Sequence, residues 1–295
     1  MIRLDAATVL LQWATGGLFF LWITTRRRQL GIGYGWLMRS IYGVLAVGAY
    51  VAGRIVQPDA VRDVCSLATA AAAAVALGVS IVRRKAGVAG ERDRRRRKEA
   101  RVAAMTGAAT VDTPAPIGDT GAAGRTAGEP AEFPPVLDLM APAIGVVGLV
   151  AAAVAAGGPT GLALARTLVG AAFLGSITDA MLLGHWYLVQ PGLGRAPILE
   201  LIRWLAGLWP LEIAVLIWPT GMFSVLSGSV DDGWNGTLGW FWVACALATI
   251  ILVGVTHLAL KEKAYSAVMA ATGLLYLAIL TAFGTDLVAR AVLTR

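Results

Sequence analysis

Two histidines are the residues of this chain best suited to bind a metal or a redox cofactor. His185 occurs in the segment GHWYLVQPG and His257 in GVTHLALKEK, six residues before Pro191 and four residues before Lys261. At 1.5 Å per helical residue, the two imidazoles lie about 9 Å and about 6 Å from the ends of their helices. Two neutral imidazoles at matching depth can ligate the iron of a b-type haem, bind a copper ion, or hydrogen-bond a quinone head group. The sequence therefore predicts a haem b or quinone site, with His185 and His257 as metal ligands or cofactor contacts.

Separate structural roles are the alternative for these histidines. Trp186 and Tyr187 follow His185 directly, and such aromatic residues gather at membrane–water interfaces. Each imidazole would then hydrogen-bond a neighbouring helix or lie at the interface. If a haem is bound, its propionates need cations, and Arg39 and Arg203 are the candidates within apolar segments. Both arginines can instead extend along their aliphatic stems to the lipid head groups.

Two carboxylates lie deeper in the apolar segments. Asp179 is twelve residues before Pro191 and Glu212 is fourteen residues after Ile198, which places both about 18–21 Å from the same surface. An ionisable residue inside a membrane segment is costly and indicates a functional site. Pro210 frees a backbone carbonyl and can kink its helix, which makes room for water or a ligand. We therefore predict a proton or ion pathway through Asp179 and Glu212, the alternative being hydrogen-bonded residues that fasten helices together.

Four further charged residues have simpler explanations. Asp286 and Arg290 are spaced i, i+4 and are expected to form a solvated ion pair at the outer end of their helix. Arg166 is expected to be solvated in the same way. Asp138 follows two prolines and is expected at a helix N-terminus, where the helix dipole favours a carboxylate.

The chain that carries these residues has the composition of an integral membrane protein. Of its 295 residues, 57% are hydrophobic and 15% charged, whereas a soluble domain carries about a quarter charged residues. Eight stretches reach the roughly 20 residues that a membrane-spanning helix needs. The predicted fold is an all-α, polytopic membrane helix bundle of about eight transmembrane helices. They cover residues 4–25, 31–53, 61–82, 136–157, 163–190, 198–222, 238–260 and 264–289.

The distribution of basic residues predicts how the bundle is oriented. Basic residues follow the first, third, fifth and seventh stretches, and basic loops face the cytoplasm, so both termini are predicted to face outward. Residues 83–101 are densely charged, and 102–135 are poor in large apolar residues, which predicts a disordered cytoplasmic linker. The linker divides the chain into a three-helix block (1–82) and a five-helix block (136–295). The richness in Ala, Gly and Val and the scarcity of Lys suggest a bacterial plasma membrane protein.

The net charge of +7 belongs to one segment of the chain. Residues 83–101 hold ten basic and three acidic residues, and the remaining residues balance. A cluster of this kind beside a membrane helix is attracted to anionic lipid head groups, so we expect no nucleic-acid binding. The chain has no Walker motif, HExxH, GxSxG or CxxC pair, and its two cysteines lie in separate apolar segments. These absences leave hydrolase and ATP-driven chemistry without recognisable residues.

Three functions remain open from the sequence. The first is a bacterial membrane protein of respiratory or redox metabolism, binding haem b or a quinone through His185 and His257. The second is a proton- or ion-coupled transporter that uses Asp179 and Glu212. The third is a non-catalytic subunit that binds other membrane subunits through its Trp-rich surface.

Overall fold

A computed structural model describes residues 5–86, 132–190, 192–219 and 221–293, together with positions 88, 96 and 100. Every regular element within these residues is a helix. The eight long helices are α1 (Ala6–Thr25), α2 (Ile32–Val56), α3 (Ala60–Val82), α5 (Met140–Ala155), α6 (Thr160–Val189), α7 (Ala196–Ile217), α9 (Thr237–Ala259) and α10 (Tyr265–Leu293). Three short elements accompany them, namely η1 (Arg83–Ala86), η2 (Pro135–Leu139) and α8 (Met222–Leu226).

Seven of the described helices are long and apolar enough to cross a membrane. They are α1, α2, α3, α5 with η2, α6, α9 and α10. The structure thus confirms an all-helical protein compatible with several membrane crossings. The remaining long helix, α7, has 22 residues and contains Glu200, Arg203 and Glu212. A count of eight spans and the direction of the termini stay predictions.

Side-chain caps explain where two of the described helices begin. The Asp5 carboxylate accepts hydrogen bonds from the backbone N–H groups of Ala7 and Thr8 at the start of α1. Asp59 accepts one from the backbone N–H of Arg62, at 2.9 Å, at the start of α3. Such bonds satisfy N–H groups that have no partner within the helix.

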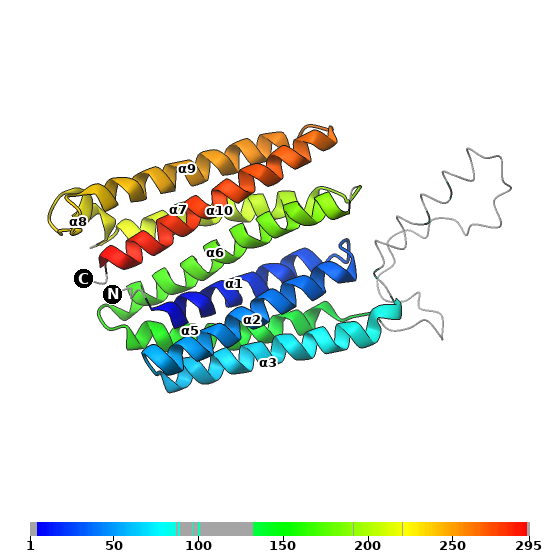
Figure 1. The fold of residues 1–295 in the computed structure, drawn as a ribbon, viewed down its shortest axis with the longest axis horizontal. Helices are drawn as coiled ribbons and strands as arrows, with labels where there is room; N and C mark the ends of the chain where they lie inside the picture. Colours follow the sequence, from blue (N-terminus) through cyan, green and yellow to red (C-terminus); the bar gives the residue numbers. More distant parts are fainter. Residues whose placement is uncertain are drawn as a thin grey trace.

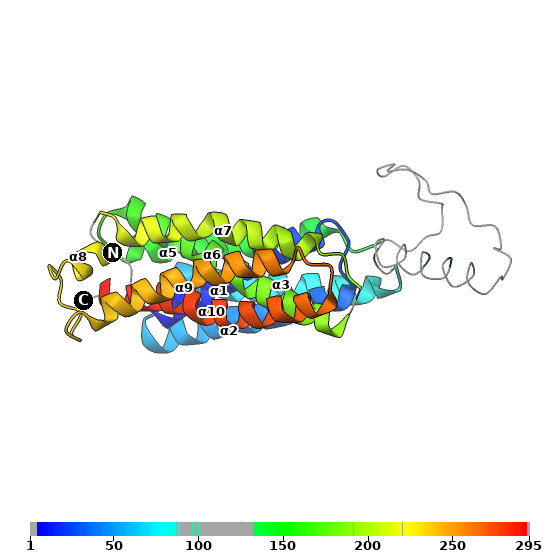
Figure 2. The ribbon, with the colours of Figure 1, turned by 90° about the horizontal axis from the view of Figure 1, so that it is seen from above.

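The eight long helices of the described residues pack as two groups of four, which lie one beside the other (Figures 1 and 2). In the first group, α1 packs on α2, α2 on α3, α3 on α5, and α5 on α1. In the second group, α6, α7, α9 and α10 close a ring in the same way. Helix α5 follows the linker in sequence but packs with the three helices before it, and the division of the chain into two sequence blocks stays a prediction. Helices α1 and α6 join the two groups along their lengths.

Small residues allow α1 and α6 to approach closely. A Cβ atom built on Gly16 of α1 would lie 1.8 Å from the carbonyl oxygen of Ala171, and one on Gly175 of α6 would lie 2.2 Å from the carbonyl carbon of Gly16. Such small-residue contacts are typical of packed membrane helices. Glycine is therefore required on both sides of this junction.

The bundle has two distinct ends (Figure 1). The start of α1 and the end of α10 lie together at one, here called the terminal end, and η1 and the α1–α2 connection lie at the other, here called the opposite end. The opposite end carries the basic residues Arg26, Arg27, Arg28, Arg83, Arg84, Lys85, Arg195, Lys261 and Lys263. Most of the basic segment 83–101 and nearly all of the predicted disordered region 102–135 fall outside the described residues.

Candidate functional site

A cluster of ionisable side chains is buried among α6, α7 and α10. Asp286 and Arg290 of α10 form a bidentate ion pair, with N–O distances of 2.6 and 3.0 Å. Glu212 of α7 interacts with this pair and with Arg166 of α6, and all four side chains are almost wholly excluded from solvent. We call Arg166, Glu212, Asp286 and Arg290 the Glu212 cluster.

Burial of this cluster corrects the expectation that Asp286, Arg290 and Arg166 are solvated. Asp286 is 0% exposed and Arg290 1%. Gly170 of α6 makes the burial possible, because a Cβ atom there would lie 3.2 Å from both the Arg290 Nη2 and the Asp286 Oδ1 atoms. The i, i+4 spacing correctly indicated the ion pair. The spacing gave no information about α6, the helix that covers this ion pair.

Gln12 of α1 joins the cluster from the first group of helices. Its Nε2 atom donates to the carbonyl oxygen of Thr167 at 2.6 Å, and a Cβ atom on Gly170 would lie 3.1 Å from Nε2. Its Oε1 atom is buried and receives no hydrogen bond from the described residues. Gln12 was not among the residues predicted from the sequence, although an uncharged polar residue within an apolar segment was a usable signal.

A polar cavity connects the terminal end to this cluster. It has a volume of about 150 Å³. Its exposed side is formed by Gln57 and Pro58, and its walls include Thr167 and Arg290. The carboxylates Asp5 and Asp59 and the guanidinium of Arg62 complete its charged lining, with Thr8 beside them. Water can therefore reach the buried cluster from this end, since the cavity exceeds the space that a water molecule occupies.

Asp179 forms a second buried site, deeper along α6. The Tyr42 hydroxyl of α2 donates a hydrogen bond to the Asp179 Oδ1 atom, and Oδ2 receives none from the described residues. Trp13 of α1 donates to the neighbouring Thr178 hydroxyl at 2.9 Å. Asp179 lies nine residues beyond Gly170, or about 14 Å along the helix. Asp179 is therefore held against α2, whereas Glu212 of α7 interacts with groups on α6 and α10, so the two carboxylates occupy separate sites.

The two histidines lie on two different helices of the second group, α6 and α9. His185 is exposed on α6, with its Nδ1 atom 3.2 Å from the Tyr276 hydroxyl of α10. His257 is half-buried on α9. Helix α10 packs extensively against both α6 and α9, which make no extended contact with each other. Among the described residues, no group of three or more histidine, cysteine or acidic side chains is arranged to hold a metal ion.

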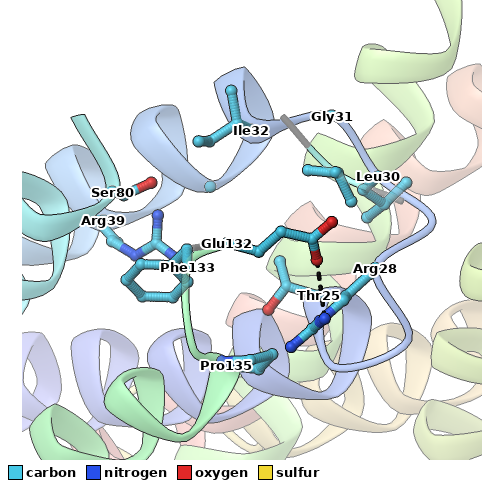
Figure 3. A pocket seen from close by; sticks show the side chains of 12 residues that line it. Thr25, Arg28, Leu30, Gly31, Ile32, Arg39, Ser80, Glu132, Phe133 and Pro135 are labelled. Atoms are coloured by element: carbon cyan, nitrogen blue, oxygen red, sulfur yellow. Dashed lines mark hydrogen bonds and ion pairs between the residues drawn. The ribbon is translucent and has the colours of Figure 1, made fainter. Parts of the chain in front are cut away.

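Arg39 belongs to a buried structural contact at the opposite end (Figure 3). Its Nε and Nη2 atoms donate to Asp138 at 2.7 and 2.8 Å, and the ring of Phe133 lies 4.3 Å from its guanidinium carbon. A small cavity of about 40 Å³ lies beside it, with the Arg28–Glu132 ion pair of 2.7 Å on its wall. Asp138 thus lies near the start of its helix, as expected, and its partner is Arg39.

Arg203 remains on the surface of α7. Its Nε atom donates to the carbonyl oxygen of Leu199 at 3.2 Å, within the same helix. No hydrogen bond within the described residues joins Arg39 or Arg203 to either histidine. The proposed propionate contacts stay predictions.

In the part of the chain that the structure describes, these features define an all-helical architecture with seven long apolar helices and buried ionisable groups. No protein-family model, curated protein or solved structure matches the chain.

Proposed function

We propose that this chain is an eight-helix protein of the bacterial plasma membrane that moves protons, alone or coupled to a solute, through the Glu212 cluster. Helix α7 is then the eighth span, and both termini face outward. The observation that carries the proposal is Glu212 itself. Its two carboxylate oxygens are buried and receive no hydrogen bond from a donor in the described residues, although the side chain lies within a charged cluster.

The geometry supports a proton as the transported species. The Glu212 carboxyl group interacts electrostatically with the Asp286 carboxylate, and two neighbouring buried carboxyl groups are stable together only when one of them holds a proton. Arg290 binds both oxygens of Asp286, which stabilises Asp286 as the charged partner. Glu212 is therefore the group that accepts and releases the proton.

The surrounding sites supply a route to and from Glu212. The cavity at the terminal end brings water to Arg290 and Thr167, next to the cluster. Further along α6, the Asp179–Tyr42 pair offers a second protonatable group towards the opposite end. Buried ionisable residues of this kind are typical of proton relays in pumps and transporters.

Proton flux into proteoliposomes tests the proposal directly. With a membrane potential imposed and a pH-sensitive dye trapped inside, we expect Glu212→Gln to lower the initial flux at least tenfold. The matched control is Glu262→Gln, the same substitution in the exposed connection between α9 and α10, which should leave the flux unchanged. Equal flux in the Glu212→Gln and wild-type proteins, at equal thermal midpoints, would overturn the proposal.

A second candidate function rests on His185. Its exposed imidazole beside the Tyr276 hydroxyl can hydrogen-bond a quinone head group that enters from the bilayer, which would support the respiratory alternative. A shared haem b would instead require His185 and His257 to face one iron, although α10 packs against both helices that carry them. An absorbance spectrum of the dithionite-reduced protein detects a haem b, and a solvent extract of the purified protein detects a quinone. If neither a Soret band nor a quinone is found, the redox function is contradicted.

A further inference from the structure

A groove runs along the outer face of α7, beside the end of α1. It has a volume of about 470 Å³. Helix α7 packs against α6 and α9 but touches α1 only slightly, and one edge-to-face contact, between Phe20 and Trp204, bridges the gap. The groove is lined by Arg27, Glu200, Arg203, Trp204, Gly207, Leu208 and Leu211.

The end of the groove nearest the opposite end of the bundle is positively charged. Arg26 and Arg27 both reach Glu200, at 2.5 and 3.4 Å. Within the described residues, the one hydrogen bond of Arg203 goes to the backbone carbonyl of Leu199 in its own helix. Three arginines against one carboxylate leave an excess of two positive charges. Guanidinium groups bind phosphate oxygens strongly because their N–H groups match them in pairs.

The rest of the groove is apolar and open. Gly207 has no atom within 4 Å of the position that a Cβ would take, and Leu211 is 53% exposed beyond it. From Arg203 to Leu211 the helix rises about 12 Å. The groove therefore offers a charged end followed by an apolar channel running along the helix.

We infer that this groove binds one anionic phospholipid. The phosphate head group lies against Arg27 and Arg203, and an acyl chain lies along Trp204, Gly207 and Leu211. This polarity matches a lipid because the charge is confined to one end of the groove. Basic pockets between membrane helices are known to bind acidic lipid head groups in this way.

Native mass spectrometry of the full-length protein, with phosphatidylglycerol or phosphatidylcholine added in mild detergent, tests the inference. We expect the wild type to retain one phosphatidylglycerol with at least a tenfold preference over phosphatidylcholine. The double variant Arg27→Gln/Arg203→Gln should lose at least four-fifths of that preference. Gly207→Leu, which fills the channel without changing the charge, should lower the retention of both lipids.

Two matched controls separate a defined site from general attraction. Lys261→Gln/Lys263→Gln removes the same charge from the same end, and Gly254→Leu adds the same side chain at an open position of α9. Both should retain phosphatidylglycerol as the wild type does. The inference is overturned if either control loses the lipid equally. It is also overturned if Gly207→Leu converts a dimer to a monomer at unchanged lipid retention, because a second copy of the chain then occupies the groove.

Discussion

Buried arginine–carboxylate pairs are the main polar contacts inside this bundle. Arg39 binds Asp138, Arg290 binds Asp286, and Arg62 binds Asp63. Removing a charge from water costs several kcal/mol per ion, and the cost is offset only when good geometry and further hydrogen bonds accompany the pair. The bidentate contacts of Arg39 and Arg290 provide that geometry. Of these three pairs, Arg39–Asp138 joins segments far apart in the sequence, α2 and η2, whereas the other two lie within one helix.

Breaking the Arg39–Asp138 pair on one side should be strongly destabilising. Arg39→Met leaves the Asp138 carboxylate buried without its cation, so we expect a loss of about 3–5 kcal/mol in the free energy of unfolding. The double variant Arg39→Met/Asp138→Leu should recover most of that loss. Denaturant unfolding in detergent micelles measures both, and a double variant as unstable as Arg39→Met would contradict the explanation.

The Asp232 carboxylate is expected to make the stability of the connection before α9 depend on pH. Its burial raises the pKa of the carboxyl group, but hydrogen bonds from the backbone N–H groups of Trp234, Gly236, Gly239 and Leu238 outweigh that effect and lower it. A lowered pKa means that the stabilisation is complete above the ordinary carboxyl pKa of about 3.9 and is lost as the pH falls through the lowered value.

Amide hydrogen exchange at Leu238 measures this effect. We expect its protection to persist below pH about 3.9 and to disappear only at more acidic pH. Asp232→Ala should abolish the protection throughout the range, whereas Asp231→Asn should leave it intact, because Asp231 accepts a bond only from Gly233. Loss of protection at the ordinary carboxyl pKa in the wild type would refute the prediction.

At the level of elements, the α1–α6 junction has little tolerance for added volume. The atom nearest to a Cβ on Gly16 belongs to the backbone of Ala171, so no side-chain rotation can relieve the clash. The same junction holds Gln12 and Trp13 against α6. Separation of α1 from α6 would therefore disturb both the Glu212 cluster and the Asp179 site.

Gly16→Ala is expected to lower the free energy of unfolding by about 1–3 kcal/mol or more, as overpacking does. Gly78→Ala is the matched control, because Gly78 lies within α3 with open space around it. There the substitution should stabilise the helix by about 0.5–1 kcal/mol. Thermal midpoints in the same detergent compare the two, and equal midpoints would show that the junction can separate without cost.

At the scale of the whole molecule, charge distinguishes the two ends of the bundle. Basic residues crowd the opposite end, whereas the cavity at the terminal end has both signs of charge. Because basic loops stay in the cytoplasm, the opposite end should face inward. The polar cavity then opens to the outside.

Reporter fusions test this orientation. Alkaline phosphatase joined after residue 293 should be active, because the enzyme folds only outside the cytoplasm, and phosphatase inserted within residues 102–131 should be inactive. A fluorescent protein that folds in the cytoplasm should give the reverse result. Active phosphatase within 102–131 would show that the bundle is inverted.

The helices themselves could be predicted closely from the sequence. Segments predicted at 31–53 and 238–260 are observed as Ile32–Val56 and Thr237–Ala259, because a run of about 20 apolar residues bounded by polar ones is a local property of the chain. The same local property indicated the apolar setting of Asp179 and Glu212.

Only the tertiary structure decided which buried groups meet. Tyr42 and Asp179 are 137 residues apart, and Arg39 and Asp138 are 99 apart. Asp286 and Arg290 are close in sequence, yet the close approach at Gly170 of α6 encloses them. The physical reason is that hydropathy and periodicity describe one helix at a time. The contact between two side chains depends on how their helices are rotated and packed, and at the α1–α6 junction that is set by small residues from distant parts of the chain.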